Sequence, residues 1–269
     1  MNLSDYNIGG DNPQSCLFVG DSGTGKSIAA AYYKRETDPR GIYFASCDGR
    51  MGAVAEWHRG RKDIEFDVFN NYEELDDKIE SLVISCPYQT LIVDPLTNIS
   101  SQLIRYSFSL RGLVEWNEET GKAEKKSKGK TKGRIDMSTW DDIGVEHRGI
   151  EDIILNMKII SKEHRVNIIL IAHLLTTTYT KVGGVESNIR RDIVTAGKKI
   201  VPFIPTQFDE FYHFYTESDR WKVKTYNDGI VAARSSFLLM PREIDWTEKN
   251  FYELISKYYI PSERKQDNV

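Results

Sequence analysis

Cysteine is scarce in this chain, and apolar residues never form a long run. The three cysteines among 269 residues, Cys16, Cys47 and Cys86, lie in or beside apolar segments, and no pair has the spacing of metal ligands. No segment has the form of a signal peptide, and no run of about eighteen apolar residues is present. We therefore expect a cytoplasmic protein with buried, reduced thiols and no membrane association.

A large excess of positive charge is also missing. The formal net charge is −4, yet residues 122–134 hold seven basic residues and one acidic residue, so this segment is +6 and the remainder is −10. The overall charge disfavours a protein that coats nucleic acid, whereas a local basic segment suits contact with a polyanion. The length and a hydrophobic content of 40% are sufficient for one large α/β domain.

One glycine-rich segment carries a specific chemical signal. Residues 20–27 read GDSGTGKS and match the phosphate-binding pattern G-x-x-x-x-G-K-[ST] at every fixed position, directly after an apolar run at 16–19. Glycine lets the backbone N–H groups fold around phosphates, the lysine opens a helix, and the serine hydroxyl can bind Mg²⁺. ATP and Mg²⁺ are the expected cofactors. The expected nucleotide-binding residues are Gly20, Asp21, Ser22, Gly23, Thr24, Gly25, Lys26 and Ser27.

Apolar runs alternate with helical patterns along the following chain. Strands are predicted at 15–20, 41–47, 89–94 and 167–172. A helix is predicted over 28–34, and helices with one apolar face are predicted from residue 72 and over 146–164. This order is typical of an α/β fold with a mostly parallel sheet covered by helices on both faces. Residues 1–12 form a polar lead-in to a domain at 13–240. Residues 241–269 are predicted to form an amphipathic helix, capped by Thr247, and a polar tail.

Two segments depart from this alternation. Residues 117–136 are rich in lysine and glycine, which predicts a mobile insertion after the third strand. From about residue 208 the pattern becomes strand-like, with strands expected at 208–215, 221–226 and 230–239 and a turn at 227–229. We expect this region to extend the sheet in an antiparallel manner.

Three polar residues end predicted strands and suit a nucleotide site. Asp94 closes the apolar strand TLIVD and is predicted to hold Mg²⁺ together with Ser27. Pro95 follows it, so a carboxylate that activates water must come from elsewhere; Asp48, after the second strand, is the best candidate, and a plain Asp-Gly turn is the alternative. His173 ends the fourth strand and suits contact with the γ-phosphate, or simply a hydrogen-bonded histidine at a strand end.

Taken together, these residues resemble the RecA-like core ATPases, specifically phage-type AAA-domain proteins related to the Sak-four single-strand annealing recombinases. The resemblance covers residues 13–240. It rests on the segments 20–27, 91–94 and 171–173, on Asp48, and on a late strand pair that includes 221–225, 227–229 and 233–234.

This resemblance implies a RecA-like P-loop NTPase core in which the His173 strand lies between the phosphate-loop strand and the Asp94 strand. It also implies assembly into a ring or filament, ATP-linked binding of single-stranded DNA, and annealing or strand exchange during phage recombination or replication in the bacterial host cytoplasm. A single-strand binding protein is a further candidate partner. Asp48 would stand for the family's catalytic glutamate, one methylene shorter, and Arg234 for a basic residue that reaches a neighbour's nucleotide. The catalytic residues expected on this basis are Lys26, Asp48, Asp94, His173 and Arg234.

In proteins of this kind the loops after the third and fourth strands contact DNA. Here these loops correspond to residues 95–140 and 174–199, and their basic residues suit a phosphate backbone bound without sequence preference. For the lysine-rich segment, a solvated loop without a ligand is an equal alternative. The candidate DNA-binding residues are Lys125, Lys126, Lys128, Lys130, Lys132, Arg190, Arg191, Lys198 and Lys199.

The leading interpretation is therefore a P-loop ATPase stimulated by single-stranded DNA. Its first alternative is a nucleotide-dependent switch, such as a helicase loader or assembly factor with little hydrolysis, which the shorter carboxylate Asp48 favours. A small-molecule phosphotransferase is a third candidate because kinases use the same loop, but no arginine-bearing lid is evident.

Overall fold

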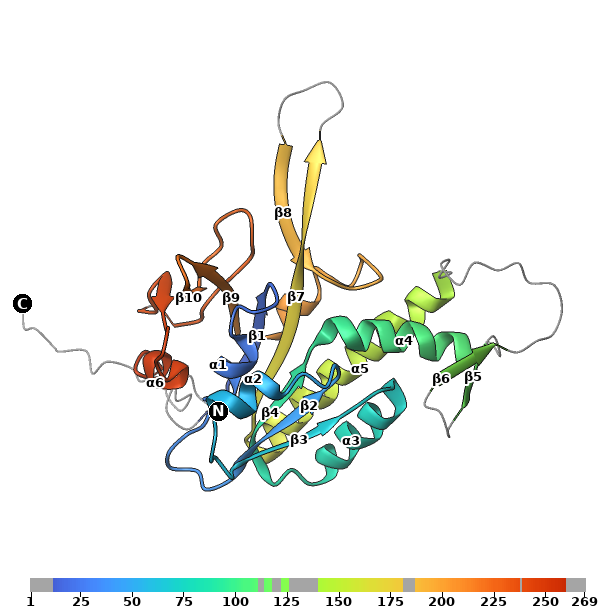
Figure 1. Cartoon of the computed structure of the whole chain (residues 1–269), viewed down its shortest axis with the longest axis horizontal. Coiled ribbons are helices and arrows are strands. Elements are labelled where there is room, and N and C mark those ends of the chain that lie inside the picture. Colours follow the sequence, from blue (N-terminus) through green and yellow to red (C-terminus); the bar gives the residue numbers. More distant parts are fainter. Residues whose placement is uncertain are drawn as a thin grey trace, which may run out of the picture.

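The fold is built around one large, mostly parallel sheet (Figure 1). The computed structural model describes residues 12–110, 114–117, 122–125, 140–180, 187–237 and 239–259. The strands that form the sheet follow the order β11-β10-β9-β1-β7-β4-β2-β3, and β8 pairs with β7. The six strands from β9 to β3 are parallel to one another, whereas β8, β10 and β11 pair in an antiparallel manner. Their bounds are β1 Ser15–Gly20, β2 Gly41–Ser46, β3 Ile64–Val68, β4 Tyr88–Asp94, β7 Asn167–Thr180, β8 Ser187–Ile193, β9 Glu210–Glu217, β10 Arg220–Lys224 and β11 Glu243–Asp245.

The central strands confirm the expected topology. β7, which carries His173, lies between β1 and β4, so the phosphate-loop strand and the Asp94 strand are separated by one strand. All four strands predicted for the core are present, and β7 is longer than expected. Because parallel strands end at the same sheet edge, Gly20, Ser46, Asp94 and His173 meet there.

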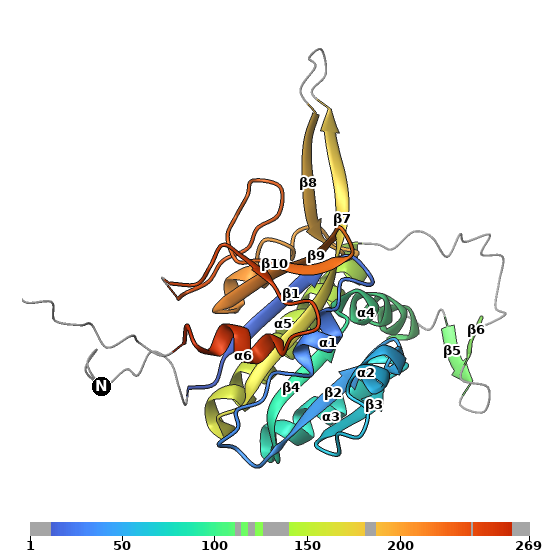
Figure 2. The ribbon, with the colours of Figure 1, turned by 60° about the vertical axis from the view of Figure 1, so that its left-hand side comes forward.

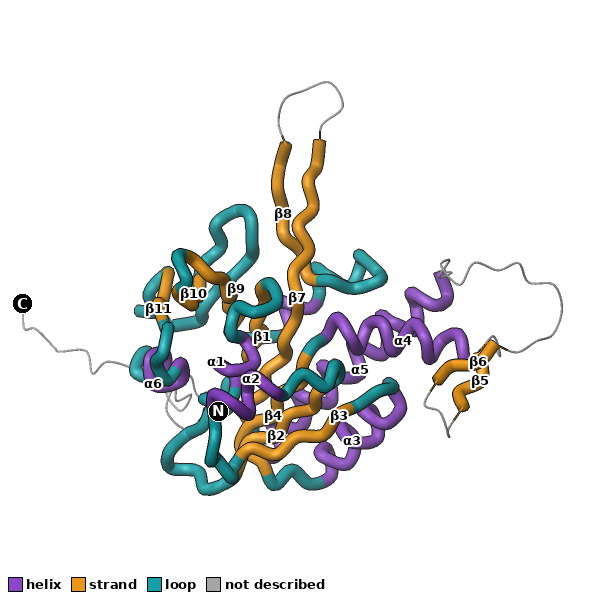
Figure 3. The backbone as a smooth tube through the Cα atoms, in the orientation of Figure 1, coloured by secondary structure: helices purple, strands orange, loops and turns teal. Residues whose placement is uncertain are grey.

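Helices cover both faces of this sheet, as Figures 2 and 3 show. Alternate residues of β1 point to opposite faces: Leu17 and Val19 pack with the helices α3, α4 and α5, and Cys16 and Phe18 pack with α1, α2 and α6. All four side chains are fully buried. The helix bounds are α1 Lys26–Ala30, α2 Gly52–Trp57, α3 Tyr72–Ile84, α4 Leu96–Leu110, α5 Trp140–His164 and α6 Phe251–Ser256.

The helix α4 corrects one sequence-based expectation. The whole stretch 95–140 was expected to be a loop, but its first part forms a helix with Ile99 and Leu103 fully buried. α5 packs closely on it, because a Cβ on Gly149 would lie 2.2 Å from Leu103 Cδ2. Of the expected insertion at 117–136, Asn117 ends β5 (Val114–Asn117) and 122–125 form its antiparallel partner β6 (Lys122–Lys125). The other insertion residues lie outside the described part of the chain.

The end of β7 gives a second correction. The stretch from Leu174 was expected to be a loop, but β7 continues to Thr180 and pairs with β8. The backbone of this hairpin projects beyond the rest of the fold in both views (Figures 1 and 2). Threonines and a tyrosine dominate residues 176–180, and their β-propensity is the signal that was overlooked.

The C-terminal region confirms an antiparallel extension but with different strands. β9 and β10 form a hairpin whose turn residues Ser218 and Asp219 have φ values of 51° and 60°, and β11 pairs with β10. The described residues of 230–239 do not form the expected strand, and among them an isolated bridge joins Arg234 to Phe211. The residue that caps α6 is Asn250, whose side chain accepts from the Glu253 N–H, so the predicted Thr247 cap is wrong.

Candidate functional site

The phosphate loop follows β1 and leads into α1, as expected, although the helix ends at Ala30 rather than near Lys34. Glycine is required at two positions. Gly20 approaches β9 so closely that a Cβ would lie 2.2 Å from the Phe214 carbonyl oxygen, and Gly25 has a φ of +80° and lies against Trp246. The loop thus has the backbone shape that a phosphate cradle needs.

Lys26 is held inside this loop. Its side chain is only 4% exposed, and Nζ donates to the carbonyl oxygens of Gly20 at 3.0 Å and of Asp21 at 2.6 Å. Burial lowers the pKa of the ammonium group to about 8, against the opposing charges of Asp94 and Asp21. The lysine is therefore positioned in the loop before any ligand arrives.

Ser27 and Asp94 come together at the same edge. The Ser27 hydroxyl donates to Asp94 Oδ2 at 2.5 Å, across 67 residues of sequence. Burial raises the pKa of Asp94 to about 6, and the negative charge of Asp48 adds to this rise. The site therefore offers a hydroxyl oxygen and a buried carboxylate whose charge no cation fully balances. Such oxygen ligands fit Mg²⁺. The predicted pair of metal ligands is thus brought into contact.

Asp48 lies beside these groups, in a pocket of about 430 Å³. Its carboxylate accepts from the Arg50 backbone N–H at 3.0 Å and lies 3.9 Å from Arg50 Nε. Asn98 of α4 also lines this pocket and donates to the Cys47 carbonyl at 3.2 Å. The sequence analysis did not predict Asn98, because α4 was not expected so close to Asp94, and it gave Arg50 no role. The remaining lining residues are Asp21, Ser22, His173 and Leu174.

His173 faces the same pocket from β7, next to Gly20 in the sheet register. Its Nδ1 atom is buried without a hydrogen-bond partner among the described residues. Burial lowers the pKa of the imidazole, and the Lys26 charge lowers it further. A neutral ring with a buried, unpaired nitrogen is suited to a hydrogen bond with a ligand.

A tryptophan cluster that sequence reasoning also missed lies against Gly25. Trp221 of β10 stacks on Trp246 with ring centroids 4.8 Å apart, and Trp57 of α2 lies 5.0 Å from Trp221. A Cβ on Gly25 would lie 2.6 Å from Trp246 Cζ2 and 3.1 Å from Trp221 Cδ2. Because indole emission depends on its surroundings, we expect these tryptophans to report a change in the phosphate loop.

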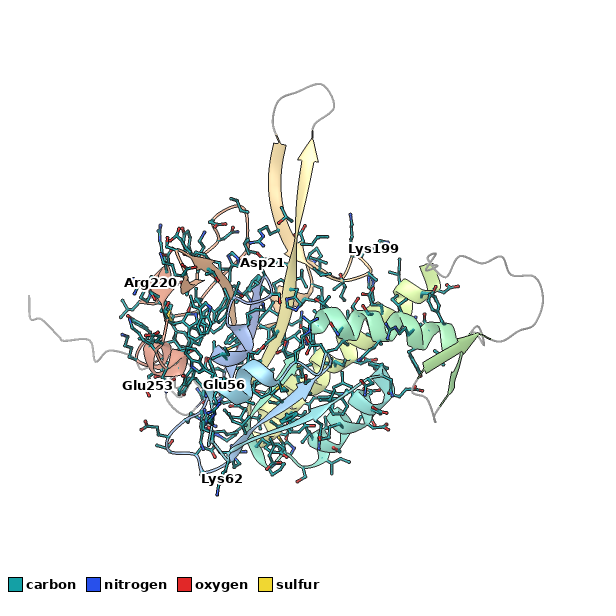
Figure 4. All side chains as sticks on the ribbon, in the orientation of Figure 1. Asp21, Glu56, Lys62, Lys199, Arg220 and Glu253 are labelled. Carbon is teal, nitrogen blue, oxygen red and sulfur yellow. The ribbon has the colours of Figure 1, made fainter. Side chains whose placement is uncertain are left out.

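The candidate DNA-binding residues are not gathered in one place. Arg191, at the base of the β7–β8 hairpin, forms an ion pair with Asp21 of the phosphate loop. Figure 4 shows Asp21 near this base and Lys199 in a separate loop. Lys198 and Lys199 are exposed, while Arg190 and Lys125 lie on β8 and β6 with side chains outside the described part. The others, Lys126, Lys128, Lys130 and Lys132, fall entirely outside it.

Arg234 forms the isolated bridge with Phe211. Its guanidinium donates to the carbonyl oxygens of Pro205, at 3.1 Å, and Phe208. It is exposed to solvent. The structure thus ties Arg234 to its own chain, and a role at a neighbouring subunit stays a prediction.

The comparisons with known proteins agree with this geometry. A family model described as an AAA domain matches residues 12–235, which is most of the chain. The chain belongs to this AAA domain family. It is thus an AAA-type P-loop ATPase domain, a family that binds nucleotides and typically uses Mg²⁺. A search of curated proteins gave no match. Among the described residues, no helix is long and apolar enough to cross a membrane.

Proposed function

We propose that this protein binds and hydrolyses ATP, with a role in single-stranded DNA transactions. The observation that supports hydrolysis most directly is the arrangement around Lys26: a Ser27–Asp94 contact, with Asp48 and His173 lining one pocket at the same sheet edge. A nucleotide's phosphates would lie in the loop between Lys26 and this pocket. Ser27 and Asp94 would hold Mg²⁺, which when bound neutralises phosphate charge.

Each residue of the site has a defined task in this proposal. Lys26 binds the terminal phosphates through its ammonium group, and His173 donates or accepts a hydrogen bond at the outermost one. Asp48 orients a water molecule in the pocket and accepts its proton. Its carboxylate is held by the Arg50 N–H, which keeps it in place for this role.

The proposed DNA-linked role is supported by the projecting β7–β8 hairpin. It carries Arg190 and Arg191 and begins immediately beyond His173. A nucleic-acid strand bound to this hairpin would lie close to His173, which lines the proposed ATP pocket. On this basis we propose that the protein anneals or exchanges strands of single-stranded DNA in phage recombination or replication, in the host cytoplasm. It would act as a ring or filament related to the Sak-four proteins, and a single-strand binding protein would assist it.

The proposal is tested by ATPase rates with and without a single-stranded oligonucleotide at low salt, with Lys26→Ala as the blank. We expect stimulation by DNA that weakens as salt rises. Asp48→Asn should abolish turnover while nucleotide still quenches tryptophan fluorescence. Nucleotide binding without DNA-dependent turnover would contradict the DNA-linked role.

A nucleotide-dependent switch is the second candidate function. The engagement of Asp48 with Arg50 favours it, because a carboxylate held by its own chain is less available to a water molecule. Turnover unchanged in Asp48→Asn, together with an oligomeric state that changes with bound nucleotide, would support the switch. Sedimentation with ADP and with a non-hydrolysable ATP analogue measures this difference.

A further inference from the structure

A second pocket lies on the opposite side of the phosphate-loop tip from Asp48 and His173. It has a volume of about 460 Å³ and shares Asp21 and Ser22 with the first pocket. The first pocket is lined from β7 and α4, whereas the second is lined from β8, β9 and β10. The second pocket therefore presents its own set of side chains: Thr24, Arg191, His213, Tyr215, Thr216, Lys224, Asp228, Ile230 and Val231.

Two side chains in this pocket carry buried nitrogen atoms that lack hydrogen-bond partners among the described residues. His213 is only 4% exposed, and both of its ring nitrogens are unpaired; Arg191 Nε is also buried and unpaired. An unsatisfied buried polar atom costs roughly 1–3 kcal/mol, so such atoms are usually paired. The His213 ring stacks on Tyr215 at 5.6 Å, which fixes its orientation. These atoms are therefore positioned for a ligand that can pair with them.

Two cations border the same space. Arg191 pairs with Asp21, and Lys224 Nζ donates to Asp228 Oδ2 at 2.7 Å. Each cation keeps further N–H groups, because a guanidinium has five and an ammonium three. The two acidic partners hold these cations in place while leaving donors for a further acceptor. Donors from a guanidinium, an ammonium and an imidazole suit the oxygens of a phosphate.

We propose that Arg191, His213 and Lys224 form a phosphate-binding site, and that it takes a backbone phosphate of a single DNA strand lying along the β7–β8 hairpin. The choice of DNA rests on the proposed function; free phosphate has the same chemistry. The position favours a strand, because Arg191 lines the pocket and lies at the base of a hairpin that projects from the fold (Figure 1).

This site has a direct route to the ATP pocket. A phosphate that binds Arg191 competes with Asp21 for the guanidinium, and the Asp21 carbonyl accepts from Lys26 Nζ. Binding of a strand thus changes the partners of a phosphate-loop residue that touches the catalytic lysine. Stimulation of hydrolysis by DNA would follow from this exchange.

The test compares Arg191→Gln and Lys224→Gln with Lys62→Gln, an exposed basic residue before β3 that lies outside the pocket. The Kd for a labelled oligothymidylate is measured by fluorescence anisotropy over a salt series. We expect each pocket variant to raise the Kd about tenfold and to lower the salt slope by about 0.7, the loss of one phosphate contact. Lys62→Gln should change neither. Arg191→Lys keeps the charge and should retain part of the affinity, and circular dichroism checks the fold of each variant.

Calorimetry distinguishes a DNA phosphate from free phosphate as the ligand. Inorganic phosphate is titrated into protein saturated with Mg²⁺ and ADP. Phosphate uptake that Lys224→Gln removes, with DNA affinity unchanged, would identify free phosphate as the ligand. Wild-type protein that binds no oligonucleotide would contradict the proposed function, and the phosphate titration would still test the site. The site itself is overturned if both pocket variants bind oligonucleotide and phosphate as the wild type does.

Discussion

The Ser27 hydroxyl lies 2.5 Å from Asp94 Oδ2 and joins the first turn of α1 to the end of β4. Burial raises the pKa of this carboxyl group to about 6, so the folded protein disfavours its ionised form. The group is nevertheless placed where phosphates and Mg²⁺ are expected. A buried charge that is unfavourable in the protein alone, but that a ligand can pair with, is typical of a binding site.

Asp94→Asn should therefore separate activity from stability. The amide keeps an oxygen for the Ser27 hydroxyl but removes the carboxylate, so ATP hydrolysis should fall about 100-fold or more. Because the raised pKa shows that ionisation is unfavourable in the folded state, stability at pH 7 should be unchanged or higher. ATPase assays and urea unfolding measure the two effects. A large loss of stability would mean that Asp94 serves mainly to hold the fold.

ATP affinity should depend on pH through Lys26. The pKa of its ammonium group is lowered to about 8 by burial, so the unliganded protein loses this charge as the pH rises above 8. Phosphates bind the protonated form, so the Kd for ATP should rise toward tenfold per pH unit above 8. Tryptophan quenching across pH 7–10 measures it. Lys26→Met should bind more weakly at every pH and lose this dependence; the same pH dependence in the variant would assign it elsewhere.

Gly25→Ala should disrupt the phosphate loop. The residue has a φ of +80°, and a Cβ would lie 2.6 Å from the Trp246 ring, which is fully buried. We expect nucleotide quenching to disappear and stability to fall by about 1–3 kcal/mol. Gly52→Ala is the control, since a Cβ there meets nothing within 4 Å. Equal behaviour of the two variants would show that the loop adapts easily.

The sequence alone was sufficient to predict the phosphate loop, Asp94 and the core strands, whereas the position of the His173 strand between the other two was implied by the resemblance to RecA-like ATPases. These features depend on local patterns, namely a glycine-rich motif and apolar runs that end in polar residues. The pairing of Arg191 with Asp21 could not be foreseen, because 170 residues separate the two and only the antiparallel return of β8 brings them together. A contact between residues that are far apart in the chain leaves no pattern in the local sequence.

The tryptophan cluster is a second example of long-range contacts that the sequence does not predict. Trp57, Trp221 and Trp246 come from α2, β10 and the segment after β11, and each fits its own element without any sign of a common site. The late strands were also misplaced, since the Asn227–Gly229 turn signal was read as a hairpin. The structure uses Asp228 there to accept from the Ile230 and Val231 N–H groups. A turn motif fixes local backbone geometry and leaves strand pairing to the rest of the fold.

Arg234 offers a test of action between subunits. If it reaches a neighbour's nucleotide, Arg234→Ala should lower the ATPase rate about 10³-fold. Mixing it with Lys26→Ala protein should restore activity, because each Lys26→Ala subunit supplies an intact Arg234 to a working site. The rate is measured across mixing ratios. No recovery at any ratio, with both proteins co-assembled, would leave Arg234 with the structural contacts to Pro205 and Phe208 alone.

Glu210 should be a main determinant of stability. It is fully buried and accepts hydrogen bonds from the Tyr212 hydroxyl at 2.6 Å, the Ser235 hydroxyl at 2.6 Å and the Ser236 N–H at 2.8 Å. Glu210→Ala leaves these donors unpaired and should lower the free energy of unfolding by about 3–5 kcal/mol. Asp209→Asn, an exposed neighbour, should stay within about 0.5 kcal/mol of wild type. Urea unfolding followed by tryptophan fluorescence compares them. Similar midpoints for both would show that solvent or rearrangement satisfies the donors around Glu210, and that the segment after Arg234 is held by its backbone pairing to Phe211 instead.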